Sequence, residues 1–330
     1  MPEKPALLPL NAVLEAFADR HRFRWYEAAP WVVAIAAYFL FPTYLPLGSQ
    51  ILATILFGIA VDLVLGYAGI VTLGHAAFFG VGAYTAGILA ARGWGEPLSG
   101  LAAAGVVAGL VGWASGVVIL RSRGLTLLMQ TLVVAVLLFE LANKATWLTG
   151  GADGLLGMEV WPILGTFGFD LFGHTAYVYS LLVLFLGWIL ARHIVHSPFG
   201  CSLTGIRENE RRMYAIGAPV QRRLVTIYAV SAALAGIAGA VVAQTTQFVA
   251  LTSLSLDRSG TILVMLIIGG VGRLYGAFIG VPLYMIAQDQ FSQIDPVYWF
   301  FWIGLFMVLL VIFAPGGILG TSERLLRRRP

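Results

Sequence analysis

Long apolar runs separated by short polar segments dominate the pattern of hydrophobic and polar positions along this chain. A helix needs about 20 predominantly apolar residues to cross the hydrocarbon core of a bilayer, so each long run predicts one span. The predicted spans are 28–46, 49–66, 75–92, 98–120, 124–143, 174–192, 224–247 and 296–314. A further apolar run, 260–288, is interrupted by glycines around Arg273, which predicts two half-spans that enter the membrane and return. The pattern therefore predicts an all-α polytopic membrane protein with about eight transmembrane helices plus broken or re-entrant half-helices.

Amino-acid composition supports insertion into a membrane. The chain is 59% hydrophobic and 11% charged, whereas soluble domains carry about 25% charged residues. Its one cysteine, Cys201, excludes a disulfide within the chain and any metal site built from several cysteines. The five histidines lack the spacing of a metal site with acidic neighbours, so we expect neither metal ligands nor catalytic residues, and a membrane-embedded enzyme is a weak alternative.

Basic residues indicate how the chain is threaded through the bilayer, because arginine and lysine accumulate on the cytoplasmic side. With the N-terminus inside, both termini are cytoplasmic, and only Arg92, Lys144 and Arg258 of the 20 basic residues fall outside. The basic clusters are spread over separate loops beside the spans, so this topology explains them better than nucleic-acid binding does.

The same threading predicts the domain organisation. A cytoplasmic N-terminal tail covers 1–27, a transmembrane domain covers 28–314, and a cytoplasmic C-terminal tail covers 315–330. Two longer loops interrupt the transmembrane domain, a periplasmic loop at 144–173 and a cytoplasmic loop at 193–223.

The segment GYAGIVTLGHAAFFGVGAYT, which runs from Gly66 to Thr85, is the first candidate for a solute pathway. Helix-breaking glycines at membrane depth are tolerated where the chain is buried in protein or lines a watery cavity. The segment and the acid before it supply backbone dipoles, side-chain hydrogen bonds and an apolar lining for a zwitterionic solute. The candidate pathway residues are Asp62, Gly66, Gly69, Thr72, Gly74, His75 and Phe78.

Each of these residues also has a structural interpretation. His75 is also consistent with a packing or capping histidine at the start of the next helix, and this interpretation is favoured over direct contact with solute. Asp62 either braces the broken segment or carries a proton, and proton coupling would indicate an ion-coupled secondary transporter. Small residues at spacing four, as in Gly105-xxx-Gly109 and Ala235-xxx-Gly239, predict close helix packing.

A faint internal repeat accompanies the two glycine-rich regions. The residues at 77–84 recur at 277–284 as Ala-Phe-(Phe or Ile)-Gly-Val-x-x-Tyr, and each copy follows a glycine-rich break. Repeated halves are common in transporters, which have the solute path at the interface of the halves. The match predicts two related helices.

The cytoplasmic loop contains a short amphipathic pattern from Ile206 to Gly217, which predicts a helix that ends at this glycine. Two roles remain open for it. The helix either docks a soluble partner or lies flat on the lipid headgroups with its arginines on phosphates.

Five sequence blocks in order resemble the permease subunits of branched-chain amino acid ABC importers, closest to the M-type subunit. They are GYAGIVTLGHAAFFGVGAYT, WLTGGADGL, GIRENERRMYAIGA running into SAALAGIAGA, GGVGRLYGAFIG and FAPGGILG, and the similarity covers about 48–320. The resemblance implies a heterodimer with a second permease subunit, two ATP-binding subunits and a periplasmic solute-binding protein. It implies a multi-pass protein of the bacterial inner membrane that translocates branched-chain or related hydrophobic amino acids.

ATP chemistry is expected on the partner subunits, with no cofactor in this chain. The only two lysines, Lys4 and Lys144, lie outside any GxxxxGK[ST] pattern, so ATP and Mg²⁺ would bind the separate ATPases. By resemblance the 206–217 helix is the coupling helix, with contact or shape-determining residues Glu208, Glu210, Arg211, Arg212 and Gly217. Importers of this broad type often carry adjacent alanines before the loop glycine, and this chain has Arg211-Arg212-Met213-Tyr214 there instead.

The solute is the least determined part of the expected function. Related permeases serve urea and aromatic acids, and much of the selectivity of such systems lies in the binding protein. An importer of the same type for another small solute is therefore an alternative to one for branched-chain amino acids.

Overall fold

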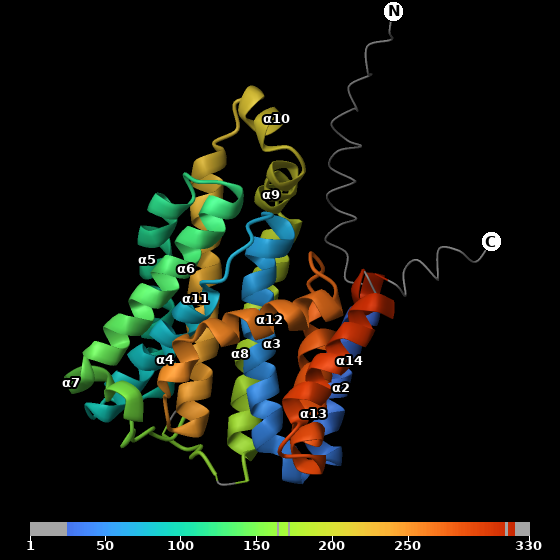
Figure 1. Ribbon diagram of the computed structural model, residues 1–330. Coiled ribbons are helices and arrows are strands. Elements are labelled where there is room, and N and C mark those ends of the chain that lie inside the picture. The colour runs from blue at the N-terminus through green and yellow to red at the C-terminus, as the bar shows by residue number, and fades with distance from the viewer. Residues whose placement is uncertain (1–24, 164, 171, 314–315, 321–330) are drawn as a thin grey trace, which may run out of the picture.

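The computed structural model describes residues 25–163, 165–170, 172–313 and 316–320, and within them the chain is a bundle of helices (Figure 1). The longer helices are α2 Ala29–Leu40, α3 Leu45–Asp62, α4 His75–Ala91, α5 Pro97–Ile119, α6 Gly124–Lys144, α8 His174–His196, α9 Pro198–Glu208, α11 Val220–Thr246, α12 Leu256–Gly269, α13 Gly276–Ile294 and α14 Trp299–Phe313. The short ones are η1 Trp25–Ala28, η2 Pro42–Tyr44, the π-helix η3 Leu63–Tyr67, α7 Thr146–Thr149, η4 Gly151–Asp153, α10 Glu210–Ala215 and η5 Leu251–Leu254. No strand is assigned in these ranges beyond isolated bridges.

The predicted polytopic all-α architecture is confirmed. Five helical stretches are long and apolar enough to cross a membrane: Pro42–Tyr67, α5, α6, α8 and α11. Shorter apolar helices occupy the first predicted span, the span after the first glycine break and the last span. The run at 260–288 is broken as expected, into α12 and α13. The predicted cytoplasmic termini and most of both tails lie outside the described residues.

Helix α11 is the centre of the bundle and packs against α5, α4 and α3. The small residues predicted to pack do so: a Cβ atom at Gly105 or Gly109 would lie 3.1 or 3.2 Å from Ile237 or Ala233 of α11. On the other side, Gly239 of α11 fits directly against the Phe79 carbonyl of α4. Helix axes this close exclude any larger side chain, and van der Waals packing therefore holds the bundle together.

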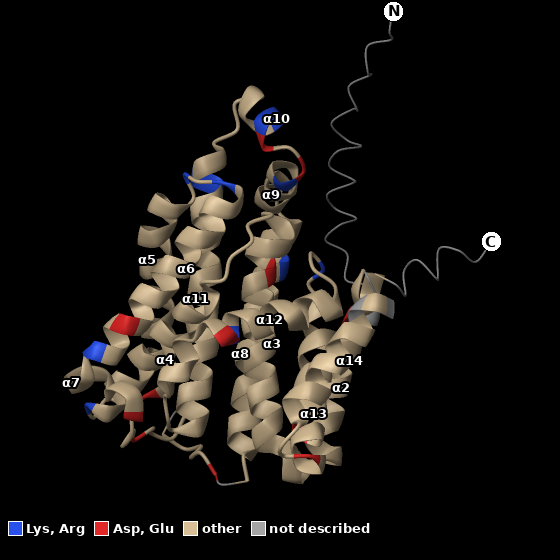
Figure 2. Ribbon diagram, in the orientation of Figure 1, with Lys and Arg blue, Asp and Glu red and all other residues tan. Residues whose placement is uncertain are grey.

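The outer surface of α5 and α6 is apolar along its length. Val106, Leu110, Val133, Leu137 and Leu141 are all more than half exposed. Such a continuous apolar surface is unfavourable in water and suits lipid chains. Charged positions gather mainly at the two ends of the bundle, as Figure 2 shows.

The bundle has two distinct ends. One carries α9 and α10 and is called the α10 end, at the top of Figure 1; the other carries α7 and the residues between α7 and α8. At the α10 end Arg192 of α8 forms an ion pair with Glu27 at 3.1 Å, so the residue just before α2 lies beside the C-terminal part of α8.

Candidate functional site

The first glycine break, residues 63–74, interrupts the membrane-spanning helix that begins at α3. The chain passes from α3 into a π-helical turn, Leu63–Tyr67, and then leaves the helix, with Gly69 at φ 73°. π-Helical turns are rare and occur frequently at functional sites. One backbone hydrogen bond, from Ile70 N–H to the Val64 carbonyl at 3.0 Å, folds the irregular segment back, and α4 begins at His75.

The second glycine break, residues 270–275, joins α12 to α13. Gly270 and Gly272 adopt φ values of 115° and 77°, which favour glycine. The two helices cross so closely that a Cβ atom at Gly269 would overlap the Gly276 carbonyl, and one at Gly280 would overlap the Met265 carbonyl. The second break is therefore a tightly packed hairpin.

The two breaks meet at Gly66, and we call this contact the Gly66 junction. The Gly272 N–H donates a hydrogen bond of 2.7 Å to Asp62 Oδ1. A Cβ atom at Gly66 would lie 2.5 Å from both Cα and N of Gly272, so only a glycine fits. The carbonyl of Gly66 in turn accepts a hydrogen bond from the guanidinium of Arg207, at the end of α9. The junction thus links the first break, the second break and the segment 197–219 between α8 and α11 at the α10 end, which we call the polar loop.

His75 belongs to a buried hydrogen-bond network. Its Nε2 lies 2.8 Å from the hydroxyl oxygen of Ser231, and that hydroxyl donates its single hydrogen to the Ala60 carbonyl at 2.5 Å. The Ser231 oxygen must therefore accept a hydrogen bond from Nε2–H of His75, so the imidazole hydrogen lies on Nε2. Nδ1 faces the Thr72 hydroxyl at 3.4 Å, and the ring packs edge-on against Phe78 and Tyr228. The network ties the start of α4 to α3 and α11.

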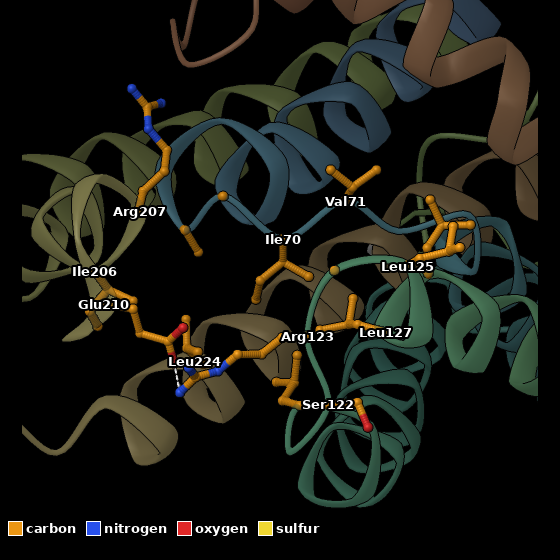
Figure 3. Close-up of a pocket in the computed structure, with 15 residues that line it drawn as sticks. Ile70, Val71, Ser122, Arg123, Leu125, Leu127, Ile206, Arg207, Glu210 and Leu224 are labelled. Atoms are coloured by element: carbon orange, nitrogen blue, oxygen red, sulfur yellow. Dashed lines mark ion pairs between the residues drawn. The ribbon is translucent and has the colours of Figure 1, made fainter. Parts of the chain in front are cut away.

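A cavity of about 420 Å³ opens beside the first break at the α10 end (Figure 3). One side is lined by Ala68, Gly69, Ile70 and Val71. The rest is lined by the start of α6 and the loop before it, the end of α9, Glu210 and Leu224. Arg123 reaches across it to Glu210, at 2.9 Å, and its guanidinium lies 5.8 Å from the ring of Tyr214. The cavity is therefore bounded by the first break on one side and by the polar loop on the other.

The polar loop differs in one respect from the prediction of a single helix over 206–217. It contains two helices, α9 and α10, separated by Asn209 in an extended conformation. The Asn209 side chain accepts a hydrogen bond of 3.0 Å from the Arg212 N–H and so caps the start of α10, which turns the chain there. The predicted C-terminal glycine is confirmed: Gly217 has φ 78°, and the next N–H bonds back to the Met213 carbonyl at 3.0 Å.

The candidate pathway residues divide by exposure. Asp62, Thr72, His75 and Phe78 are each at most 2% exposed and contribute to packing or hydrogen bonding inside this chain. Gly66 and Gly74 are also buried, and Gly69 alone among the seven is exposed and lines the cavity.

The candidate coupling residues lie together on the polar loop. Glu208, Arg211, Arg212 and Gly217 are exposed, while Glu210 is half-buried in its ion pair. Arg207 is the residue that sequence reasoning missed, although it lies next to Glu208; it is exposed, and its guanidinium donates a hydrogen bond to the Gly66 carbonyl of the pathway segment. Arg123 was assigned to the cytoplasmic side only as a topology marker. In the described residues, no cluster of three or more His, Cys, Asp or Glu side chains suits a metal ion.

A family model described as the permease component of branched-chain amino acid transport systems matches residues 44–314. The chain belongs to this family. A relative from Salmonella typhimurium, a high-affinity branched-chain amino acid transport system permease protein LivM, is 27% identical over 88% of this chain and 74% of its own length. LivM from Escherichia coli is 26% identical over 82% of this chain and 68% of its own length.

A probable LivM from Methanocaldococcus jannaschii is 25% identical over 42% of this chain and 44% of its own length. No solved structure matches the chain. The family match covers both breaks, the polar loop and the cavity of this permease, so all parts of the candidate site lie within the region that defines the family.

Proposed function

We propose that this permease is the transmembrane subunit of an ATP-driven ABC importer for branched-chain or related hydrophobic amino acids in the bacterial inner membrane. Its partners are a second permease subunit, two ATP-binding subunits at the α10 end, which is then cytoplasmic, and a periplasmic solute-binding protein at the α7 end. ATP and Mg²⁺ bind the ATPases. Family membership and the names of the relatives support the solute class.

The observation that carries the proposal is the bond from Arg207 to the Gly66 carbonyl. Helices α9 and α10 protrude at the α10 end and expose Tyr214 and Ile216, which are 45% and 70% exposed, beside Arg211 and Arg212. This mixture of apolar and charged side chains suits a groove on a soluble partner. A helix lying on lipid headgroups would have no need of a bond to the first break. We therefore favour ATPase docking over a headgroup role.

Coupling then follows from the contacts. When the ATPases close on nucleotide, they displace α10 and the end of α9. Arg207 transmits this displacement to Gly66, and Arg123 transmits it through Glu210 to the start of α6. Both routes reach the walls of the 420 Å³ cavity, so the first break repacks and the cavity opens or closes toward the cytoplasm.

The ion-coupled alternative depends on Asp62, and its surroundings argue against it. The carboxylate is 2% exposed and already accepts the Gly272 N–H, and it is absent from the lining of the cavity. A proton carrier needs access to water from each side in turn. Asp62 acts in this account as a brace between the two breaks.

Affinity purification from native membranes under mild conditions, followed by mass spectrometry and an import assay, tests the proposal. We expect a second hydrophobic permease and ATPases to copurify, and the assembly to import leucine in proteoliposomes only with ATP inside and the binding protein outside. An assembly that contains this chain alone and imports leucine with a proton gradient would overturn the proposal. Import of urea or an aromatic acid in place of leucine would change only the assigned solute and would leave the ATP-driven importer in place.

A further inference from the structure

Two charged residues lie at mid-depth in the bundle, at the start of α12. Arg258 is half-buried, with its guanidinium 4.3 Å from the centre of the Phe79 ring, and Asp257 beside it is exposed. Figure 2 shows charged positions at the start of α12, far from both ends of the bundle. The sequence-based topology placed Arg258 outside the membrane, whereas the structure has the start of α12 at mid-depth in the bundle.

Hydrogen bonds fix the depth of this position. Ser259, the next residue, accepts the Ala76 N–H at 3.0 Å, so the start of α12 is level with the first turn of α4. His75 in that turn contacts Ser231 of α11. At 1.5 Å per residue, Ser231 lies about 16 Å from the start of α11 at Val220 and about 22 Å from its end at Thr246. Arg258 is therefore level with the middle part of α11, a helix long and apolar enough to cross a membrane.

Neither charge is neutralised within the described part of this chain. The ion pairs found there join Arg123 to Glu210 and Arg192 to Glu27, and none involves Asp257 or Arg258. Neighbouring positions on a helix point in different directions, so these two side chains do not satisfy each other. Charged side chains at this depth face a bundle interior or a watery cavity, and they mark solute pathways. An exposed carboxylate here therefore indicates an aqueous path along this face of α12.

Helix α12 also begins at this depth, which adds a favourable field for an anion. Ser255 caps the Arg258 N–H at 3.4 Å, and the positive end of the helix dipole lies at the same place as the guanidinium. Half-helices that start in the membrane present their N-termini to anionic groups of substrates in other transporters. Phe79 is fully buried, and its ring holds the Arg258 guanidinium at the start of α12 by a cation–π contact.

We infer that Asp257 and Arg258 form a mid-membrane contact site for an amino-acid zwitterion. Arg258 and the first turn of α12 receive the carboxylate, because a guanidinium binds carboxylate through two parallel N–H bonds. Asp257 receives the ammonium group. The site explains how a zwitterion crosses hydrocarbon depth without losing all of its polar contacts. This inference rests on the proposed function, because it takes the solute to be an amino acid.

The test uses the single native cysteine to advantage. The background is the complete importer with Cys201→Ser, so that each test variant carries one cysteine in this chain. Asp257→Cys in this background is treated with a membrane-impermeant thiol reagent. The matched lipid-facing control is Val133→Cys, because Val133 is 59% exposed on the apolar face of α6. A thiol in water ionises and reacts, whereas one in lipid does not. We expect D257C to react more than about tenfold faster than V133C, and leucine-loaded binding protein with ATP to slow its reaction. Equal, slow reaction of both variants, or fast reaction that solute does not slow, would overturn the inference.

A second arm measures transport directly, with ATP hydrolysis and copurification of the second permease as checks on assembly. Arg258→Gln should lower the maximal rate of leucine import by about tenfold or more, Arg258→Lys should lower it less, and Arg92→Gln at the outer end of α4 should leave it unchanged. Unchanged import by R258Q would overturn the inference. Loss of copurification in R258Q would also overturn it, because Arg258 would then hold the two permeases together. The labelling rates of D257C and V133C are first compared without solute, so this comparison does not depend on leucine being the solute. Failure of the wild-type importer to transport leucine would therefore overturn the proposed function separately.

Discussion

The two glycine breaks differ in their surroundings, although each joins two apolar helices within the membrane. In the second break the backbones of Gly269 and Gly276 touch, and Gly270 packs against Gly317. In the first break Gly69 and Val71 are exposed and line a cavity. Glycine in a membrane helix therefore serves two purposes in one chain. The second break is a packed support, and the first is positioned to move against it.

The Gly66 junction joins the two breaks to each other and connects them to the polar loop. The second break holds Asp62 through the Gly272 N–H, while Arg207 of the polar loop holds the Gly66 carbonyl only one helical turn away. We expect a displacement of the loop to be taken up by the first break, because the helices that flank the second break are in backbone contact at Gly269 and Gly276.

The largest expected effect tests the packed break. Gly269→Ala places a methyl group on the Gly276 carbonyl, a backbone contact that cannot move aside, so we expect a loss of about 3 kcal/mol or more of stability. The melting temperature and yield of the purified protein measure it. Gly260→Ala on the same helix is the control, because nothing lies within 4 Å of its Cβ position. Equal stability of the two variants would show that the second break is not tightly packed.

A second pair of variants tests whether the exposed break carries transport. Gly69 and Gly93 both have left-handed φ values, 73° and 85°, so alanine at either costs about 1–2 kcal/mol in backbone strain. At Gly69 alone the new Cβ atom would lie 2.5 Å from Cγ of Arg207 and push that side chain off Gly66. We expect similar melting temperatures for the two variants, with leucine import lost only in G69A. Normal leucine import by G69A would show that the first break does not take part in the transport cycle.

A smaller effect is expected where the polar loop meets the start of α6. The side chains of Arg123 and Glu210 are 58% and 26% exposed, so solvent screens their ion pair and a double-mutant cycle should give a coupling energy of about 0.2–1 kcal/mol. The cycle compares Arg123→Ala, Glu210→Ala and the double variant by denaturant titration in detergent. A coupling energy above about 2 kcal/mol would show that the pair is desolvated.

Replacement of Glu210 and Arg212 together by alanine has a functional expectation of its own. It should reduce solute-stimulated ATP hydrolysis while the chain still folds in the membrane, because both positions lie on the proposed docking helix. ATPase rates with and without loaded binding protein measure this. Unchanged stimulation would move the docking surface to another loop.

The smallest expected effect concerns the link between the breaks. Asp62→Asn keeps an oxygen that accepts the Gly272 N–H, so leucine import should stay within about threefold of the wild type. Asp62→Ala removes the acceptor and should lower stability. Loss of import in D62N with normal stability would show that the negative charge or a proton on Asp62 takes part in transport.

The helices could be predicted from the sequence because membrane thickness sets their length. The predicted span 98–120 is α5, 97–119, and the predicted span 124–143 is α6, 124–144. The repeat predicted at 77–84 and 277–284 falls on α4 and α13, which both follow a break and run toward the α7 end in Figure 1. A common origin of the two helices stays a prediction.

The site was only partly predictable, because its bonds join residues far apart in the chain. Nothing local distinguishes Arg207 from Arg211, and only tertiary packing brings Arg207 to Gly66. Arg258 was placed outside by the alternation of the predicted spans, yet η5 and the start of α12 enter the bundle, where Leu254 packs on Gly80. Asn209 before Glu210 is a typical N-cap, and it is the one local pattern that predicts the division into α9 and α10.

Simultaneous measurement of leucine import and ATP hydrolysis in proteoliposomes tests the central claim, that Arg207 transmits the movement of the polar loop to the first break. The comparison is between the wild type, Arg207→Gln and Arg222→Gln, an exposed arginine of α11. We predict that R207Q hydrolyses ATP at a normal rate and imports at least about tenfold less leucine for each ATP, while R222Q matches the wild type. An unchanged ratio of leucine to ATP in R207Q would contradict the account.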